Sequence, residues 1–249
     1  MPDAATTKPT GTALIVSQDK VAIERLIPPL QQFAISLRVC PEVQEAMDLV
    51  SDRKFEAVIV DFAYGYQAVS LLHQVRDSAS NRTAVTFAIT NGPEEAALAL
   101  QRGAHFLLER PLSAESLNHT VRAAYGSILR ERRRYFRYPI TVPVLLRRPE
   151  DPQIPGQMVN ISERGMAVKT PMPLDAGSEA NVQFMLPDLT IPITTGAKVC
   201  WSNEYGHSGL QFTALSTATT SKLSAWLAVR LEEQLPKNVT DKFGSPTEL

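Results

Sequence analysis

The 249-residue sequence has few cysteines and no long apolar run, and both shortages exclude whole classes of protein. Its two cysteines, Cys40 and Cys200, are too far apart to form a metal-binding pair and too few for a disulfide framework. Each falls in a predicted strand, so we expect two buried thiols. No apolar run approaches the roughly 20 residues that a membrane-spanning helix needs. The opening MPDAATTKPTGT also lacks the basic flank and apolar core of a signal peptide, which predicts a cytoplasmic protein without membrane insertion.

Catalytic and metal-binding patterns are missing as well. His73, His105 and His119 have no cysteine or acidic partner at metal-ligand spacing, so we assign them no chemistry and expect no metal and no cofactor. No nucleophile, base and orienting residue can be assembled, which argues against an enzyme. The composition instead suits two modest domains, each with its own core.

The first half of the chain alternates short β-rich runs with segments of helical period. Strands that alternate with helices of this length predict βαβ units and a parallel sheet covered on both faces. The expected strands are 13–18, 35–40, 56–62, 84–90 and 105–111, and the expected helices are 20–33, 43–53, 68–76, 93–102 and 114–131.

The second half changes to strand after strand, separated by Pro, Gly and Asp turns. Six short strands predict a small barrel, and one amphipathic helix at 219–235 closes it. Trp201 and His207 stand near a strand end, where we expect a core or turn role. The expected strands are 140–148, 156–162, 165–170, 179–186, 191–202 and 207–215, and the apolar face of the helix carries Leu223, Trp226, Leu227 and Leu231.

The strand ends of the first half carry a specific resemblance. Asp61 ends the third strand, Thr90 ends the fourth, and Pro111 follows the fifth. This region resembles the receiver domain of two-component signalling, in which the aspartate after the third strand accepts a phosphoryl group. The resemblance implies that Asp61 is the phosphoacceptor.

Departures from the receiver pattern make Asp61 a vestigial phosphoacceptor. The positions of the family's magnesium-binding acidic pair hold Ser17 and Gln18, with Asp19 one place late, and the family's lysine is replaced by Arg110. Neutral Ser and Gln oxygens bind magnesium poorly, and without the ion phosphoryl transfer loses its main source of charge stabilisation. We therefore expect no phosphorylation, and an Arg110 side chain that pairs with Asp61 instead.

Arginine is concentrated at the junction of the two halves. The formal net charge is −1, yet residues 130–137 hold five arginines and no lysine. Arg133 and Arg137 form R-x-x-x-R, and Asn160, Ser162 and Gly165 form N-x-S-x-x-G on the second strand of the later half. With the six strands and the later GLQF, the segment from about 132 to 236 resembles a PilZ domain, the bacterial receptor module for cyclic di-GMP.

The resemblance implies a ligand site residue by residue. Arg133 and Arg137 would engage phosphate and a guanine edge, which suits a planar guanidinium. Asn160 and Ser162 would meet the other guanine, and Gly165 would let the backbone turn closely beside it. An arginine directly before the motif accompanies a stacked nucleotide pair in this family. Arg132 stands at that position.

These patterns predict a chain in two domains that acts as a bacterial signalling effector. The expected parts are a flexible tail at 1–10, a receiver-like α/β domain at 11–126, an arginine-rich hinge at 127–139, a PilZ-type barrel with its helix at 140–236, and a tail at 237–249. Cyclic di-GMP bound by the hinge and barrel would reorient the two domains for a protein partner that the sequence does not identify. A homodimer could form through the receiver-like domain.

Two other functions stay open. The first is a response regulator phosphorylated at Asp61. The second is nucleic-acid binding, because residues 122–148 hold eight arginines against one acidic residue. The shortage of lysine and of any groove-reading element argues against nucleic acid as the partner.

Overall fold

The structure is a computed structural model that describes residues 9–148 and 153–235. Nearly all of the two predicted tails lies outside the described residues. The described chain divides into two compact units, and the division falls between Arg132 and Arg133. The second unit is Arg133–Glu233, and Gln234 and Leu235 belong to the first.

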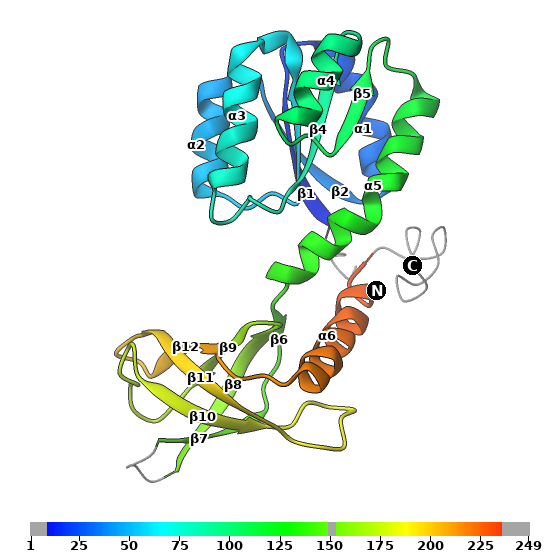
Figure 1. The fold of residues 1–249 in the computed structure, drawn as a ribbon. Helices are drawn as coiled ribbons and strands as arrows, with labels where there is room; N and C mark the ends of the chain where they lie inside the picture. Colours follow the sequence, from blue (N-terminus) through cyan, green and yellow to red (C-terminus); the bar gives the residue numbers. More distant parts are fainter. Residues whose placement is uncertain (1–8, 149–152, 236–249) are drawn as a thin grey trace, which may run out of the picture. The chain divides into compact units, whose positions relative to one another are not determined.

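The first unit is a parallel five-stranded sheet with helices on both faces (Figure 1). Its strand order is β2-β1-β3-β4-β5, which is the flavodoxin-like order and confirms the predicted receiver-like α/β fold. The strands are β1 (Gly11–Val16), β2 (Ile35–Cys40), β3 (Ala57–Asp61), β4 (Val85–Thr90) and β5 (Phe106–Glu109). The helices are α1 (Lys20–Gln32), α2 (Val43–Asp52), η1 (Phe62–Tyr64), α3 (Tyr66–Asp77), α4 (Pro93–Gln101) and α5 (Ala114–Tyr135).

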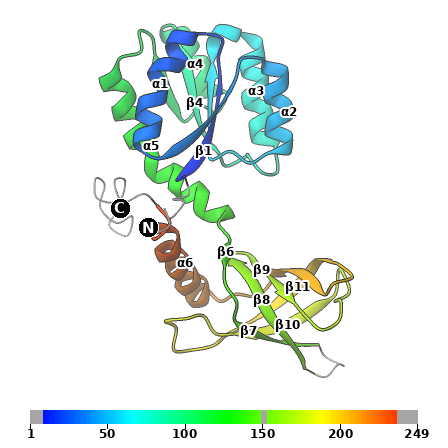
Figure 2. The same ribbon diagram turned by 180° about the vertical axis from the view of Figure 1, so that it is seen from behind.

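Two apolar cores sandwich this sheet. The helices α1 and α5 cover one face and α2 and α3 cover the other, as the views from both sides show (Figure 1 and Figure 2). Every residue of β3 and β4 is buried, as expected of central strands covered on both sides. The carboxyl ends of the strands stay free of this packing, and there Asp61 ends β3 and Thr90 ends β4, as predicted.

The end of α5 is held to the first unit by a buried carboxylate. Glu131 is 2 % exposed, accepts a hydrogen bond from Thr83 Oγ1 at 2.8 Å, and pairs with Lys54. A buried charge is tolerated only with such partners. This anchor lies directly before the arginines of the predicted site.

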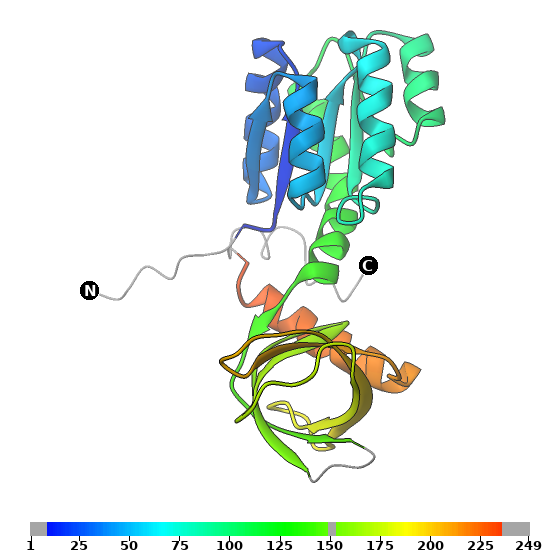
Figure 3. The same ribbon diagram turned by 90° about the vertical axis from the view of Figure 1, so that its left-hand side faces the viewer.

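The second unit is an antiparallel barrel, seen nearly end-on in Figure 3. Its strands close in the ring β7-β10-β11-β12-β9-β8, because β8 pairs with both β7 and β9, and this confirms the predicted six-stranded barrel. The elements are β6 (Tyr138–Pro139), β7 (Pro143–Arg147), β8 (Ile154–Ser162), β9 (Gly165–Lys169), β10 (Glu179–Phe184), β11 (Ile193–Ser202), β12 (His207–Phe212) and α6 (Thr217–Glu232).

The strand predicted at 140–148 starts earlier than expected and is interrupted. Both β6 and β7 pair with β8, and the residues between them break the regular ladder. Proline has no N–H to donate to a ladder, so Pro143 can stand only where a strand begins or the pairing is irregular. The short β6 matters for the site because it follows Arg137 directly.

The barrel interior and one face of α6 share a single core. Leu223, Trp226, Leu227 and Leu231 are the buried residues of α6, as predicted. The indole nitrogen of Trp226 donates to the carbonyl oxygen of Pro187 at 2.8 Å, which satisfies its only polar group.

The prediction of two buried thiols is half wrong. Cys40 is 1 % exposed, but Cys200 is exposed. The register of β11 against β12 shifts between Val199 and Trp201, and Cys200 is the extra residue of this β-bulge. Val199 fills the core, so the bulged residue faces outward. In the described part of the chain, no helix is both long and apolar enough to cross a membrane.

Candidate ligand-binding site

Most of the arginine cluster lies on the C-terminal end of α5. The predicted hinge at 127–139 is therefore helical up to Tyr135, and bending of this segment stays a prediction. Arg133 begins the second unit, where its Nη2 lies 3.9 Å from Oε1 of Glu232. Its Nε is buried without a hydrogen-bond partner in the described residues. An unpaired buried donor is costly, so this guanidinium would gain from a further acceptor.

Arg132 belongs to the first unit and faces a different carboxylate. Its Nη1 lies 3.6 Å from Oε1 of Glu56, which is 2 % exposed. The other Glu56 oxygen accepts a hydrogen bond from the backbone N–H of Thr12 at 2.6 Å. Arg132 therefore already has an anionic partner with which a phosphate would compete, although its Nε, like that of Arg133, is buried without a hydrogen-bond partner in the described residues.

The structure brings Arg137 of the first motif into direct contact with Asn160 of the second. Arg137 Nη1 donates to Oδ1 of Asn160 at 3.3 Å. The contact follows from strand pairing, because β6 places Tyr138 opposite Ile161 and Pro139 opposite Asn160. Two segments that are 23 positions apart in the sequence thus form one polar surface on the outside of the barrel.

Ser162 and Gly165 lie on either side of the two-residue turn that joins β8 to β9. Ser162 is 4 % exposed, and its Oγ donates to the carbonyl oxygen of Gly165 at 3.0 Å. A Cβ on Gly165 would lie 2.1 Å from the carbonyl oxygen of Leu210 on β12. Close packing against β12 therefore requires this glycine, and its approach to a ligand stays a prediction.

Trp201 does not have the role that we expected from the sequence. It is 49 % exposed and contributes nothing to the barrel core, so the core role is wrong. His207 is the first residue of β12, and its backbone N–H donates to Oδ1 of Asn203 at 3.0 Å, directly after the turn. The sequence carried no signal for the exposed position of Trp201, because the β-bulge that turns its side chain outward is visible only in the strand pairing.

The carboxylate of Asp61 is fully engaged. Arg110 donates to both of its oxygens, Nη1 to Oδ1 at 3.1 Å and Nη2 to Oδ2 at 2.8 Å, which confirms the predicted pair. Ser17 Oγ donates to Oδ2 at 2.6 Å, and the backbone N–H of Ala63 donates to Oδ1 at 3.1 Å. Arg110 also reaches Oδ2 of Asp19 at 3.2 Å. The hydrogen bonds to Asp61 raise the pKa of the Arg110 guanidinium.

These residues do not fit the magnesium ion of a receiver. Magnesium takes carboxylate oxygens and water, whereas this pocket offers the hydroxyl of Ser17 and the guanidinium of Arg110 next to Asp61. Asp19 caps α1, and the backbone hydrogen bond from Ala22 lowers the pKa of its carboxyl. Among the residues the structure describes, no cluster of three His, Cys, Asp or Glu could hold a metal.

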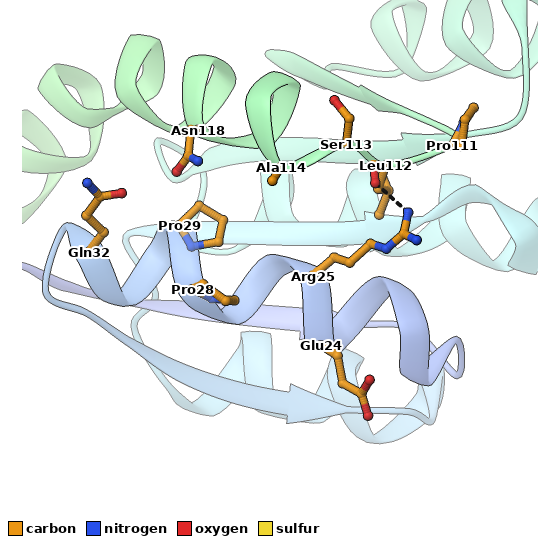
Figure 4. A pocket seen from close by; sticks show the side chains of 10 residues that line it. All are labelled: Glu24, Arg25, Pro28, Pro29, Gln32, Pro111, Leu112, Ser113, Ala114 and Asn118. Atoms are coloured by element: carbon orange, nitrogen blue, oxygen red, sulfur yellow. Dashed lines mark hydrogen bonds between the residues drawn. The ribbon is translucent and has the colours of Figure 1, made fainter.

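A separate hollow of about 650 Å³ lies between α1 and the start of α5 (Figure 4). Pro28, Pro29 and Leu112 supply apolar surface, and Arg25 donates a hydrogen bond to the carbonyl oxygen of Leu112. None of its lining residues belongs to the predicted ligand site. The hollow is therefore a feature of the first unit alone.

Comparison with known families and structures separates the two halves. Residues 131–228 match the sequence profile of the PilZ domain. No curated protein matches the chain.

Solved structures match the first half. A protein described as a response regulator from Chloroflexus aurantiacus is 25 % identical, with a TM-score of 0.43 over 48 % of this chain and 99 % of its own. The receiver domain of a sensor histidine kinase from Pseudomonas aeruginosa is 16 % identical, with a TM-score of 0.42 over 47 % of this chain and 98 % of its own. A response regulator from Thermotoga maritima is also 16 % identical, with a TM-score of 0.42 over 49 % and 98 %.

Proposed function

Because residues 131–228 form a PilZ domain, we propose that the protein is a cytoplasmic effector that binds cyclic di-GMP. PilZ domains are binding modules, so the proposal needs no catalytic group. The contact of Arg137 with Asn160 carries it, because it joins the R-x-x-x-R and N-x-S-x-x-G segments on one surface.

The polar groups on this surface match the chemistry of the ligand. Cyclic di-GMP offers two phosphates and two guanine bases. The fork of Arg137 can donate two parallel hydrogen bonds to a phosphate or to O6 and N7 of guanine. Asn160 both donates and accepts, so its amide can pair with a guanine edge once Arg137 moves to the ligand. The hydroxyl of Ser162 lies two residues further along the same strand.

Arg133 gives ligand binding a route to the rest of the molecule. Its ion pair with Glu232 is long, at 3.9 Å, and its buried Nε lacks a partner in the described residues. A phosphate would compete with Glu232 for this guanidinium and satisfy it better. If Arg133 binds the phosphate more tightly than it binds Glu232, ligand binding favours one arrangement of the arginine segment. A change in that segment would reorient the receiver-like domain.

Calorimetric titration with cyclic di-GMP tests the function, with linear guanine dinucleotide and GTP as controls. We expect cyclic di-GMP to bind and the two control nucleotides not to bind. Arg133→Ala or Arg137→Ala should each weaken it by about 2 kcal/mol, or roughly thirtyfold, because a charge-assisted pair is lost. Arg137→Lys should weaken the affinity for cyclic di-GMP nearly as much, since an ammonium cannot form the bidentate pair.

The matched control is Arg130→Ala. This exposed arginine of α5 carries the same charge but lies outside the motif, so its loss should leave the affinity nearly unchanged. Thermal unfolding of the free variants should stay close to that of the unaltered protein. Equal weakening by all three alanine variants would indicate general electrostatics and contradict the site.

A further inference from the structure

Trp201 presents a flat aromatic surface on the outside of the barrel. It is 49 % exposed, and its indole lies across Gly209 on the neighbouring strand β12. A Cβ at Gly209 would lie 2.0 Å from the indole nitrogen and 2.5 Å from Cε2. The ring therefore needs a glycine beneath it. One face rests on the sheet, and the side chain remains half open to solvent.

Strand register connects this indole to the predicted ligand site. Trp201 on β11 is opposite Gly209 on β12, and Gly209 is opposite Ala167 on β9. Ala167 is in turn opposite Asn160 on β8. With neighbouring strands about 4.8 Å apart, three steps separate the two backbones by roughly 14 Å, and the indole already covers the first step.

Two β-bulges place both ends of this row on the outer face. The register shifts between Val199 and Trp201 on β11, and between Met158 and Asn160 on β8. Met158 and Val199 stay in the core, so Trp201 and Asn160 face outward. The positions between them carry only a hydrogen and a methyl group, which leaves no large side chain in the row to separate the indole from the amide of Asn160.

We propose that Trp201 is a base-stacking residue of the cyclic di-GMP site. The inference rests on the proposed function, and it adds a residue outside both sequence motifs. Every nucleobase has a π-face, and tryptophan offers a large, rigid surface for it. A guanine stacked on the indole would have its hydrogen-bonding edge toward Asn160 and Arg137, which already contact each other at 3.3 Å.

The test compares three variants by calorimetric titration with cyclic di-GMP. Trp201→Ala should weaken binding about tenfold, since stacking on one base is lost. Trp201→Phe keeps an aromatic face and should stay within about threefold. Tyr205→Ala is the control, because Tyr205 is 73 % exposed on the same barrel but stands outside the row. Circular dichroism verifies that each variant folds.

Fluorescence provides a second readout that keeps the native Trp201. The chain has two tryptophans, and Trp226 is a buried residue of α6 in the barrel core, so Trp226→Phe leaves Trp201 as the only indole. Stacking of guanine should quench its emission with the same affinity that calorimetry reports. Unchanged emission and an unchanged affinity of Trp201→Ala, with Arg137→Ala still impaired, would overturn this inference alone. No binding by the unaltered protein would overturn the proposed function and this inference together.

Discussion

Gly165 shows how one residue can serve the barrel and the motif at once. Its α-carbon faces the backbone of β12 so closely that any side chain would strike the carbonyl of Leu210. Its own carbonyl accepts the hydrogen bond of Ser162. The glycine of N-x-S-x-x-G is thus fixed by packing of the barrel, whatever it contributes to ligand binding.

Gly165→Ala should destabilise the protein by about 2 kcal/mol, because the new methyl group overpacks a backbone that cannot move away. Gly126→Ala is the matched control. A Cβ at Gly126 meets nothing within 4 Å, and alanine favours a helix, so this change should stabilise α5 by about 1 kcal/mol. Chemical denaturation followed by circular dichroism measures both. If the Gly165→Ala protein is as stable as the unaltered one, the backbone of β12 can move to make room for the methyl group, and our interpretation is wrong.

Helix α5 carries most of the arginine cluster and is part of both units. Glu131 and Arg132 fix the helix to the first unit through Thr83 and Glu56. The second unit begins one residue later, at Arg133. Neighbouring arginines on one helix therefore belong to different units, and they face different carboxylates.

The position of Arg132 bears on how many ligands bind. If Arg132 leaves Glu56 to neutralise a stacked nucleotide pair, titration should saturate near two cyclic di-GMP molecules per chain. Arg132→Ala should then lower this toward one, with a steeper loss of affinity in high salt because charge is screened. The same calorimetric titrations measure both quantities. Saturation at one ligand in the unaltered protein would remove this role for Arg132 and leave the roles of Arg133 and Arg137 intact.

For the molecule as a whole, we expect the receiver-like unit to act as a platform without phosphorylation, because other side chains already bind the carboxylate of Asp61. Arg110 bridges Asp61 and Asp19, and Ser17 donates the shortest of the hydrogen bonds to Asp61. This network occupies the oxygens that a magnesium ion and a phosphoryl group would need. By thermodynamic linkage, a molecule that binds this unit can change the affinity for cyclic di-GMP only if it binds the nucleotide-free and the nucleotide-bound protein with different affinities.

Acetyl phosphate or beryllofluoride with magnesium should therefore leave the protein unchanged. Intact mass, oligomeric state and cyclic di-GMP affinity should stay the same, because Arg110 already binds both oxygens of Asp61 and the pocket lacks the carboxylate pair that magnesium needs. Asp61→Asn should be nearly silent in ligand binding. Mass spectrometry and calorimetry measure these effects. A phosphoryl adduct on Asp61 that alters nucleotide affinity would restore the alternative of a phosphorylated response regulator.

The two folds and the motif residues of the candidate site could be predicted from the sequence. Periodicity of two and of 3.6 is a local property, so the alternation of strands and helices, the barrel strands and the buried face of α6 could all be read from it. The pairing of Arg110 with Asp61 could also be predicted, because parallel strands end at one edge of the sheet. The sequence did not predict that the side chains of Trp201 and Cys200 point out of the barrel.

Which residues share the outer face of the barrel could be seen only after the strands were paired. A β-bulge shifts a strand by one residue and reverses which side chains point inward, and sequence alternation alone does not reveal where a bulge falls. The row from Trp201 to Asn160 exists because two such bulges occur on strands that β9 and β12 connect. Contacts between distant segments depend on register, and register is set by the packing of the whole barrel.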